Sequence, residues 1–280
     1  MRLQCGRHVL VLDAPVVMGI LNVTPDSFSD GGRYFGLPEA LAQAERLAGE
    51  GAAIVDVGGE STRPGAEPVA VEEELRRVIP VVERLAGALS VPVSVDTRSP
   101  AVMREAIAAG ASMINDVTAL RAPGALETVA ASRAAVCLMH MQGEPRTMQN
   151  EPHYDDVVGE VRNFLRERVA ACVGEGIAKS RLVIDPGFGF GKTLEHNLEL
   201  LRGLGEIAGE GLPVLAGLSR KRMIGALTGR DEGDRLAGSI ALAVMAAING
   251  ARIVGAHDVR ETVDALRIVA AARNQSKMGT

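Results

Sequence analysis

A short apolar run, Val16-Val-Met-Gly-Ile-Leu-Asn22, stops on a polar residue, and a helical stretch follows it. This arrangement occurs eight times in all, and the later runs end at Glu60, Asp96, Asp116, His140, Asp185, Lys221 and His257. Alternating strands and helices without hairpin signals indicate βα units in a parallel sheet. Eight units predict an α/β chain folded as a (β/α)8 TIM barrel. Its polar strand ends would gather at the C-terminal rim, where enzymes of this fold hold their active sites.

Composition favours one barrel domain over residues 1–280. No Pro/Ser-rich linker or charge block divides the 280 residues, and 47% of them are apolar. With no Trp, five Phe and two Tyr, the core volume must come mainly from aliphatic side chains, as expected for parallel strands buried on both faces. An apolar alternation at Val9 to Leu12 predicts a short N-terminal hairpin that closes the bottom of the barrel.

Charge and cysteine content restrict the possible partners and compartment. A net charge of −5 and a pI of about 5.6 argue against nucleic-acid binding. Cys5, Cys137 and Cys172 lack metal-site spacing, and their odd number suits a reducing compartment, the cytoplasm. The N-terminus lacks the pattern of a signal peptide. The longest apolar segment, 238–251, is too short to cross a membrane.

The chain between the strands contains helices and two long loops. Helices are expected at Pro38–Glu50, Val71–Leu89, Pro100–Ala109, Gly124–Ser132, Tyr154–Glu175, Leu194–Leu204 and Asp258–Ala272. The loops Thr24–Gly36 and Glu60–Pro68 follow the first and second barrel strands. Loops of this length at a catalytic rim are usually mobile lids.

The rim residues suggest a site for a flat, charged ligand. Asp96 and Asp185 end strands three and six, nearly opposite each other, with Asn115 beside Asp96. They can act as a general acid and base, as metal ligands, or as acceptors for a heterocycle rich in N–H groups. The role as acceptors for a heterocycle fits best. A metal site would need further acidic or His ligands at close range, and the strand geometry does not clearly supply them.

Positive charge at the same rim suggests an anionic partner. Ser219-Arg-Lys221 stands at a helix start, which favours an anion. Arg63 and His257 suggest a second anionic subsite, with Asn22 holding hydrated Mg²⁺ against phosphate oxygens. The segment 185–193 fails the spacing of both the P-loop and the dinucleotide motif. His140 and His257 make only a weak zinc pair.

Two long motifs resemble the signatures of the dihydropteroate synthase family. They are Met18-Gly-Ile-Leu-Asn-Val-Thr-Pro-Asp-Ser-Phe-Ser-Asp-Gly-Gly32 and Asp56-Val-Gly-Gly-Glu-Ser-Thr-Arg-Pro-Gly65. The segments SVDT (94–97), IND (114–116), DPGFGFGK (185–192) and SRK (219–221) follow in the family's order, so the resemblance covers essentially the whole chain.

The resemblance implies an activity and a site. The family joins p-aminobenzoate to 6-hydroxymethyl-7,8-dihydropterin diphosphate on the folate pathway, releasing diphosphate. The resemblance also implies a homodimer and inhibition by sulfonamides. The catalytic residues that it implies are Asp185, Lys221, Asp96 and Arg63. The implied pterin site is Asp96, Asn115, Met139, Asp185 and Lys221. The implied p-aminobenzoate site is Phe28, Thr62, Arg63, Pro64, Phe190, Ser219 and Lys221. Diphosphate would contact Asn22, Arg63 and His257, with Mg²⁺ on Asn22.

The chain departs from the family at Gly255, where an arginine that stacks on the pterin is expected. Arg252 cannot replace it, because strand alternation puts Arg252 on the opposite face. Arg222 stands where the family often has Ser. Two alternatives therefore remain beside the transferase: a pterin-binding homologue without turnover, and a barrel that binds methyltetrahydrofolate for methyl transfer. The two lid motifs disfavour the second.

Overall fold

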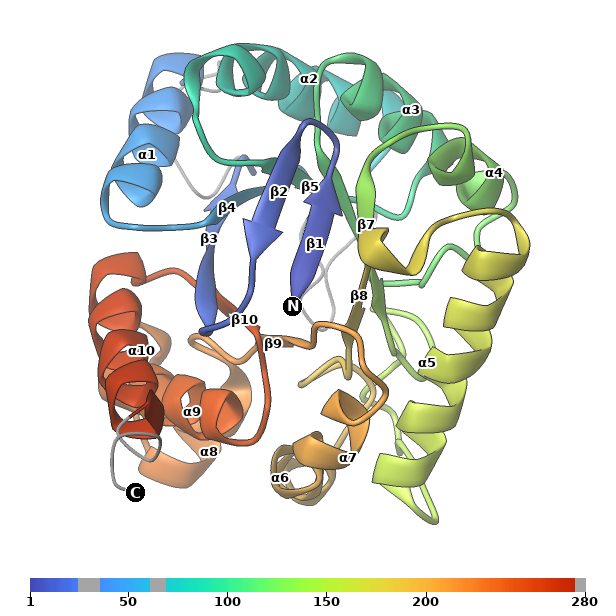
Figure 1. Ribbon diagram of the computed structural model, residues 1–280. Coiled ribbons are helices and arrows are strands. Elements are labelled where there is room, and N and C mark those ends of the chain that lie inside the picture. The colour runs from blue at the N-terminus through green and yellow to red at the C-terminus, as the bar shows by residue number, and fades with distance from the viewer. Residues whose placement is uncertain (25–35, 61–68, 275–280) are drawn as a thin grey trace.

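The computed structural model describes residues 1–24, 36–60 and 69–274, in which eight parallel strands surround one axis (Figure 1). The sheet order is β8-β7-β6-β5-β4-β3-β10-β9, and a parallel bridge between Ile184 and Val214 joins its two ends. The predicted eight-stranded barrel is confirmed. Its strands are β3 (Val16–Asn22), β4 (Ile54–Gly58), β5 (Val93–Asp96), β6 (Met113–Asp116), β7 (Ala135–Met139), β8 (Leu182–Asp185), β9 (Leu215–Gly217) and β10 (Ile253–Ala256).

Helices form a ring outside the strands (Figure 1). They are α1 (Leu37–Gly49), α2 (Val71–Ala88), α3 (Pro100–Ala108), α4 (Ala125–Ala130), α5 (Val157–Gly174), α6 (Leu194–Arg202), α7 (Leu204–Ala208), α8 (Arg222–Thr228), α9 (Leu236–Ile248) and α10 (Val259–Asn274), with 3₁₀ turns η2 (Lys179–Arg181) and η3 (Glu232–Asp234). None of the helices in these three described ranges is long and apolar enough to cross a membrane.

Three predicted helices have other bounds in the structure. The helix expected from Tyr154 begins at Val157, because Asp156 caps it by accepting from the N–H of Gly159 at 3.0 Å. The helix expected to end at Leu204 stops at Arg202, and Gly203 separates it from α7. The helix expected over 124–132 is shorter, since only Ala125–Ala130 is helical.

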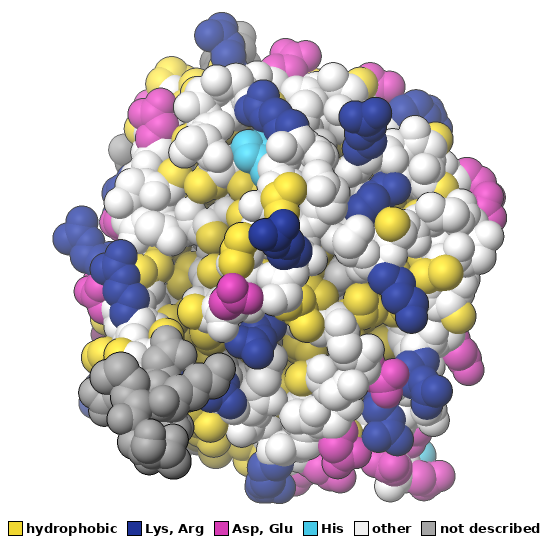
Figure 2. Space-filling model, in the orientation of Figure 1, with side chains coloured by type: hydrophobic (Ala, Val, Ile, Leu, Met, Phe, Trp, Pro, Cys, Tyr) yellow, Lys and Arg dark blue, Asp and Glu magenta, His cyan; other side chains and the backbone are white. Residues whose placement is uncertain are grey.

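The N-terminal hairpin closes one end of the barrel, as predicted. Its strands β1 (Arg2–Cys5) and β2 (His8–Val11) are antiparallel and lie across the opening (Figure 1). Leu3 and Cys5 are fully buried and pack with interior residues of the barrel strands. Basic, acidic and apolar side chains are interspersed on this face of the molecule (Figure 2).

The barrel interior is apolar towards the hairpin and polar at its other end. Met18, Ile54, Met113, Val183 and Ile253 belong to one buried cluster with the hairpin. This cluster forms an apolar floor, and burying each such side chain stabilises the fold by about 1.5–3 kcal/mol. The residues that end the strands lie above this floor, so barrel closure brings distant polar side chains to one mouth.

Candidate active site

Asp96 and Asn115 lie side by side at the mouth, because β5 and β6 pair them in register. Asn115 donates from Nδ2 to Oδ2 of Asp56 on β4 at 3.0 Å. Oδ1 of Asp96 is buried and has no hydrogen-bond partner among residues 1–24, 36–60 and 69–274. Burying an unpaired acceptor costs about 1–3 kcal/mol. A ligand N–H donor would remove that cost.

The carboxyl groups on the acidic side of the mouth have pKa values above those of free carboxyl groups. Desolvation raises the pKa of Asp96 well above its ordinary value, and the neighbouring charges of Asp56 and Asp116 raise it further. Burial also raises the pKa of Asp56, and the neighbouring Ser94 hydroxyl and the hydrogen bond from Asn115 oppose this rise in part. A group that supplies N–H donors or positive charge would therefore favour the ionised carboxylates.

Asp185 ends β8 on the other side of the mouth and is 6% exposed. Its Oδ1 accepts from the backbone N–H of Gly187 at 2.7 Å. Burial raises the pKa of Asp185, whereas the positive charge of Lys221, the Gly187 N–H and Lys192 act in the opposite direction. The carboxylate is thus held in place by its own loop and faces two lysines.

Lys221 connects the loop after β8 with the loop after β9. Its Nζ donates to the carbonyl of Phe188 and lies 4.7 Å from the centre of the Phe190 ring. Phe190 packs against a small buried cluster that contains Met139. Burial lowers the pKa of Lys221 to about 8, with Asp185 opposing the shift. A cation, an aromatic ring and an apolar side chain thus meet beside Asp185.

A second lysine, Lys192, lies buried beneath the same loop. Its Nζ donates to the carbonyls of Gly187 at 3.0 Å and Phe190 at 2.9 Å, and lies 3.0 Å from Nδ1 of His140. Burial lowers the pKa of His140 to about 3, so the ring is neutral and can accept from Lys192. The loop that carries Asp185 and Phe190 is therefore tied together by the side-chain nitrogen of one lysine, whose pKa burial lowers to about 7.

Arg220, between Ser219 and Lys221, has a left-handed backbone conformation with a φ of +56°. Its N–H donates to Ser239 Oγ at 3.0 Å, and its carbonyl accepts from Arg235 at 3.0 Å. Its guanidinium donates to both carboxylate oxygens of Asp258, at 3.1 and 2.5 Å. These contacts hold Ser219 beside the strand end of β10.

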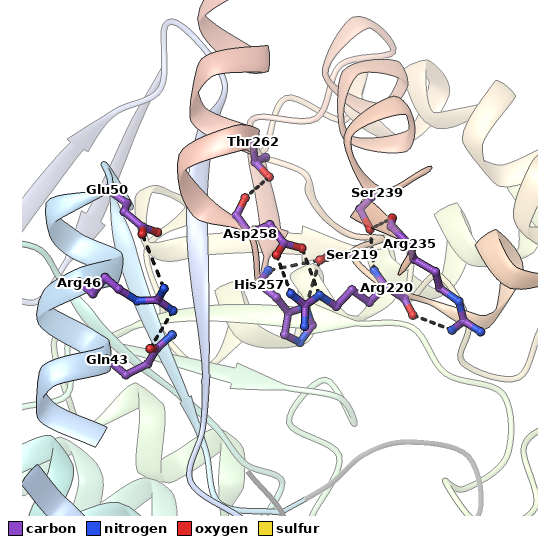
Figure 3. Close-up of polar contacts among 10 residues, drawn as sticks. All are labelled: Gln43, Arg46, Glu50, Ser219, Arg220, Arg235, Ser239, His257, Asp258 and Thr262. Atoms are coloured by element: carbon purple, nitrogen blue, oxygen red, sulfur yellow. Dashed lines mark hydrogen bonds and ion pairs between the residues drawn. The ribbon is translucent and has the colours of Figure 1, made fainter. Parts of the chain in front are cut away.

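His257 follows β10 and contacts Ser219 from the neighbouring strand end (Figure 3). The backbone N–H of His257 donates to Ser219 Oγ at 3.2 Å, and the ring nitrogen Nδ1 lies 3.0 Å from the same oxygen. His140 is instead engaged by Lys192, and no group of three or more His, Cys, Asp or Glu residues with metal-site geometry occurs in the described part of the chain. The two histidines therefore have different neighbours.

Asn22 and Gly58 end the adjacent strands β3 and β4 in register. A Cβ atom added to Gly58 would lie 3.6 Å from Asn22 Oδ1 and 3.9 Å from Asp96 Cβ, so this glycine separates the amide from the carboxylate. Gly255 on β10 likewise faces the interior, with Gly217 and Ile20 as neighbours. Arg252 donates to the carbonyl of Asp13 instead, which confirms that it cannot replace a side chain at Gly255.

Proteins of known activity are similar to this chain in sequence and in structure. The family model of pterin binding enzymes matches residues 18–257. The dihydropteroate synthase of Escherichia coli (strain K12) is 56% identical over 271 residues, which are 97% of this chain and 96% of that protein. The chain belongs to the dihydropteroate synthases, a family of pterin-binding enzymes.

Solved dihydropteroate synthases have the same fold. The Xanthomonas albilineans dihydropteroate synthase with 4-aminobenzoic acid has a TM-score of 0.92 and 57% identity, with 97% of this chain and 98% of that one covered. The Yersinia pestis enzyme in a sulfonamide complex has a TM-score of 0.93 and 51% identity, covering 98% and 100%. The family resemblance inferred from the two long motifs is therefore confirmed.

The structure brings together most of the residues predicted for a dihydropteroate synthase site. Nine predicted residues lie at or beside the mouth: Asn22, Asp96, Asn115, Met139, Asp185, Phe190, Ser219, Lys221 and His257. Phe28, Thr62, Arg63 and Pro64, together with most of the two expected lids, lie outside the described residues. The roles assigned to all thirteen remain predictions.

Sequence reasoning missed Asp56, Lys192 and the Arg220–Asp258 pair. Asp56, Lys192 and Arg220 each stand inside a motif, but none of them ends a strand at the rim in the way that Asp96 does. A signal existed for Asp56, since alternation along β4 turns Ile54, Asp56 and Gly58 to one side. For Lys192, only the folded loop shows that its ammonium group is surrounded by carbonyls.

Proposed function

We propose that this chain joins p-aminobenzoate to 6-hydroxymethyl-7,8-dihydropterin diphosphate, giving 7,8-dihydropteroate and diphosphate for folate synthesis. It is a transferase of the dihydropteroate synthase family. The observation that carries the assignment is the polar mouth above an apolar floor, with Asp96, Asn115 and Asp185 as acceptors. Such a set suits the N–H-rich edge of a flat pterin.

The reaction follows from charge separation at the pterin methylene. The bond between this carbon and the diphosphate oxygen breaks, and the electron pair leaves with the diphosphate. The amine nitrogen of p-aminobenzoate then forms the new C–N bond and loses its proton to solvent. Asp185 would favour positive charge spread over the pterin ring, while Lys221, His257 and Arg63 would stabilise the departing anion. Positioning supplies much of the remaining rate.

Two neighbouring subsites follow from the same arrangement. Phe190, Ser219 and Lys221 would contact p-aminobenzoate with Phe28, Thr62, Arg63 and Pro64. Asn22 offers one amide oxygen at the mouth, which fits a Mg²⁺ ion that keeps most of its waters and binds substrate phosphate oxygens. When bound, Mg²⁺ would neutralise charge on the diphosphate. Inhibition by sulfonamides would follow from their occupying the p-aminobenzoate subsite.

The decisive assay mixes the protein with the pterin diphosphate, Mg²⁺ and p-aminobenzoate and measures dihydropteroate. Product formation at a rate that depends on enzyme concentration is expected. Pterin binding without product would favour the homologue without turnover that Gly255 suggests. Transfer of a methyl group from methyltetrahydrofolate, with no dihydropteroate formed, would favour the methyl-transfer alternative. Weaker turnover after Asp185→Asn would connect the activity to this mouth.

A homodimer formed through α8 and α9 is part of the proposal. These two helices carry large apolar side chains that are 41% exposed or more, at Leu227, Leu236, Met245 and Ile248. Covering them would remove apolar surface from water. Ile248→Glu should convert the dimer to a monomer in sedimentation velocity, whereas Val9→Glu on the hairpin should not. A monomeric unmodified protein would contradict the proposal.

The three free, buried cysteines suit the cytoplasm.

A further inference from the structure

Asp56 is a buried carboxyl group that the proposed reaction does not use. It lies in the middle of β4, is 6% exposed, and accepts from Asn115 Nδ2 at 3.0 Å. β5 separates β4 from β6, so this hydrogen bond crosses the barrel interior rather than following the strand ladder. Burying a carboxyl group is costly unless it is hydrogen-bonded, so the contact with Asn115 is a strong constraint on both side chains.

The contact decides which atom of Asn115 is offered to a ligand. An asparagine amide has one acceptor oxygen and a donor NH₂ group. With Nδ2 bound to Asp56, Oδ1 is turned away from Asp56. When Asp56 is ionised, the flipped amide would bring Oδ1 against Oδ2 of Asp56, which puts two acceptors in contact. The ionised form of Asp56 therefore allows one orientation of the amide.

The strand register places Asn115 nearer to the mouth of the barrel than Asp56. Asp56 pairs with Ser94, whereas Asn115 pairs with Asp96, two residues further towards the mouth. We propose that Asp56 is a positioning residue that holds Asn115 with its oxygen towards the pterin, where this oxygen is an acceptor beside the Asp96 carboxylate. The inference rests on the proposed function and adds a source of specificity: the pocket selects ring edges that carry adjacent N–H donors.

Reversing the pair tests the inference. Asn115→Asp places two carboxyl groups together, and the double variant Asp56→Asn/Asn115→Asp restores a donor–acceptor pair with an oxygen still facing the mouth. Binding of 6-hydroxymethylpterin is measured by calorimetry. Asn115→Asp removes a buried charge-assisted hydrogen bond, so its affinity for the pterin should be about tenfold lower or more. The double variant should have an affinity within about threefold of the unmodified protein.

The double variant separates the two possible amide orientations. If Asn115 instead offers its N–H to the pterin, the double variant has no donor at position 115 and binds as weakly as Asn115→Asp, which overturns the inference. An unmodified protein that does not bind the pterin overturns the proposed function and the inference with it. If the unmodified protein binds but the reversed pair does not recover, only the role of Asp56 fails.

A second measurement distinguishes positioning from a purely structural role. In Asp56→Ala the Asn115 amide can turn, so the preference for 6-hydroxymethylpterin over an analogue N-methylated on the pyrimidine ring should narrow. A structural role would lower the Tm and weaken both ligands equally, and that result overturns the inference. Ser94→Ala is the matched control, because it alters the other neighbour of Asp56 and leaves Asn115 tied. It should keep the unmodified preference.

Discussion

Two glycines at the barrel mouth, Gly187 and Gly255, differ in what a side chain would meet. A Cβ on Gly187 would lie 1.9 Å from the carbonyl oxygen of His140, and its φ is +70°. Glycine is therefore required there, because the loop that holds Asp185 cannot accept a side chain. A Cβ on Gly255 would lie 3.5 Å from Gly217 Cα and 3.9 Å from Ile20 Cδ1, which are ordinary contacts. The second position can accept a side chain.

Gly255→Arg should therefore increase the rate of diphosphate release. The new side chain would extend from the interior face of β10 near Lys221 and add positive charge where the anion departs. A charge-assisted contact with stacking contributes about 1.5–3 kcal/mol, or about ten- to a hundredfold in rate or affinity. Stopped-flow measurement of diphosphate release checks this, with Gly255→Met as the uncharged control. An unchanged or lower rate would show that another group already performs this role.

At the scale of elements, the loop between β8 and α6 is built around Lys192. Gly187, Gly189 and Gly191 all have positive φ and curl the chain so that several carbonyls face inward. Lys192 Nζ donates to two of these carbonyls, and Tyr154 donates to that of Gly191 at 2.8 Å. The sequence predicted the tight turns from glycine spacing. It could not predict that the lysine next to them would turn inward, because that depends on His140, the residue after β7.

Lys192→Met should loosen this loop and displace both Asp185 and Phe190. Losing hydrogen bonds from a buried ammonium group should lower kcat/KM by about tenfold, through higher KM values for both substrates. Steady-state kinetics and Tm are measured together. Lys179→Met is the control, because Lys179 is an exposed lysine on η2. A lower Tm with unchanged KM values would show that Lys192 stabilises the fold without positioning the site.

At the scale of the whole molecule, strand ends were predictable and contacts across the barrel were not. Asp96, Asn115 and Asp185 could be placed at one rim, since the carboxyl ends of parallel strands meet there. The Asp56–Asn115 contact joins residues 59 apart and depends on the stagger of the closed barrel. Glu74 shows the same limit. It stands in the first turn of α2, where acids are usually exposed, yet it is 2% exposed because it packs under Gly59.

Glu74 makes the stability of the whole barrel depend on pH. Burial raises its pKa to about 7 from an ordinary 4.5, and Glu60 adds to the shift while Thr97 opposes it. Between these two pH values the folded chain binds more protons than the unfolded chain, so stability falls as the pH rises from about 4.5 to 7. Glu74→Gln should therefore increase the free energy of unfolding by up to about 3 kcal/mol at pH 8 and leave it little changed at pH 4. Urea unfolding at both pH values measures the difference, with the exposed Glu72→Gln on the same helix as the control. Equal stability of Glu74→Gln and the unmodified protein at pH 8 would mean that Arg77 and Arg98 fully compensate the buried charge.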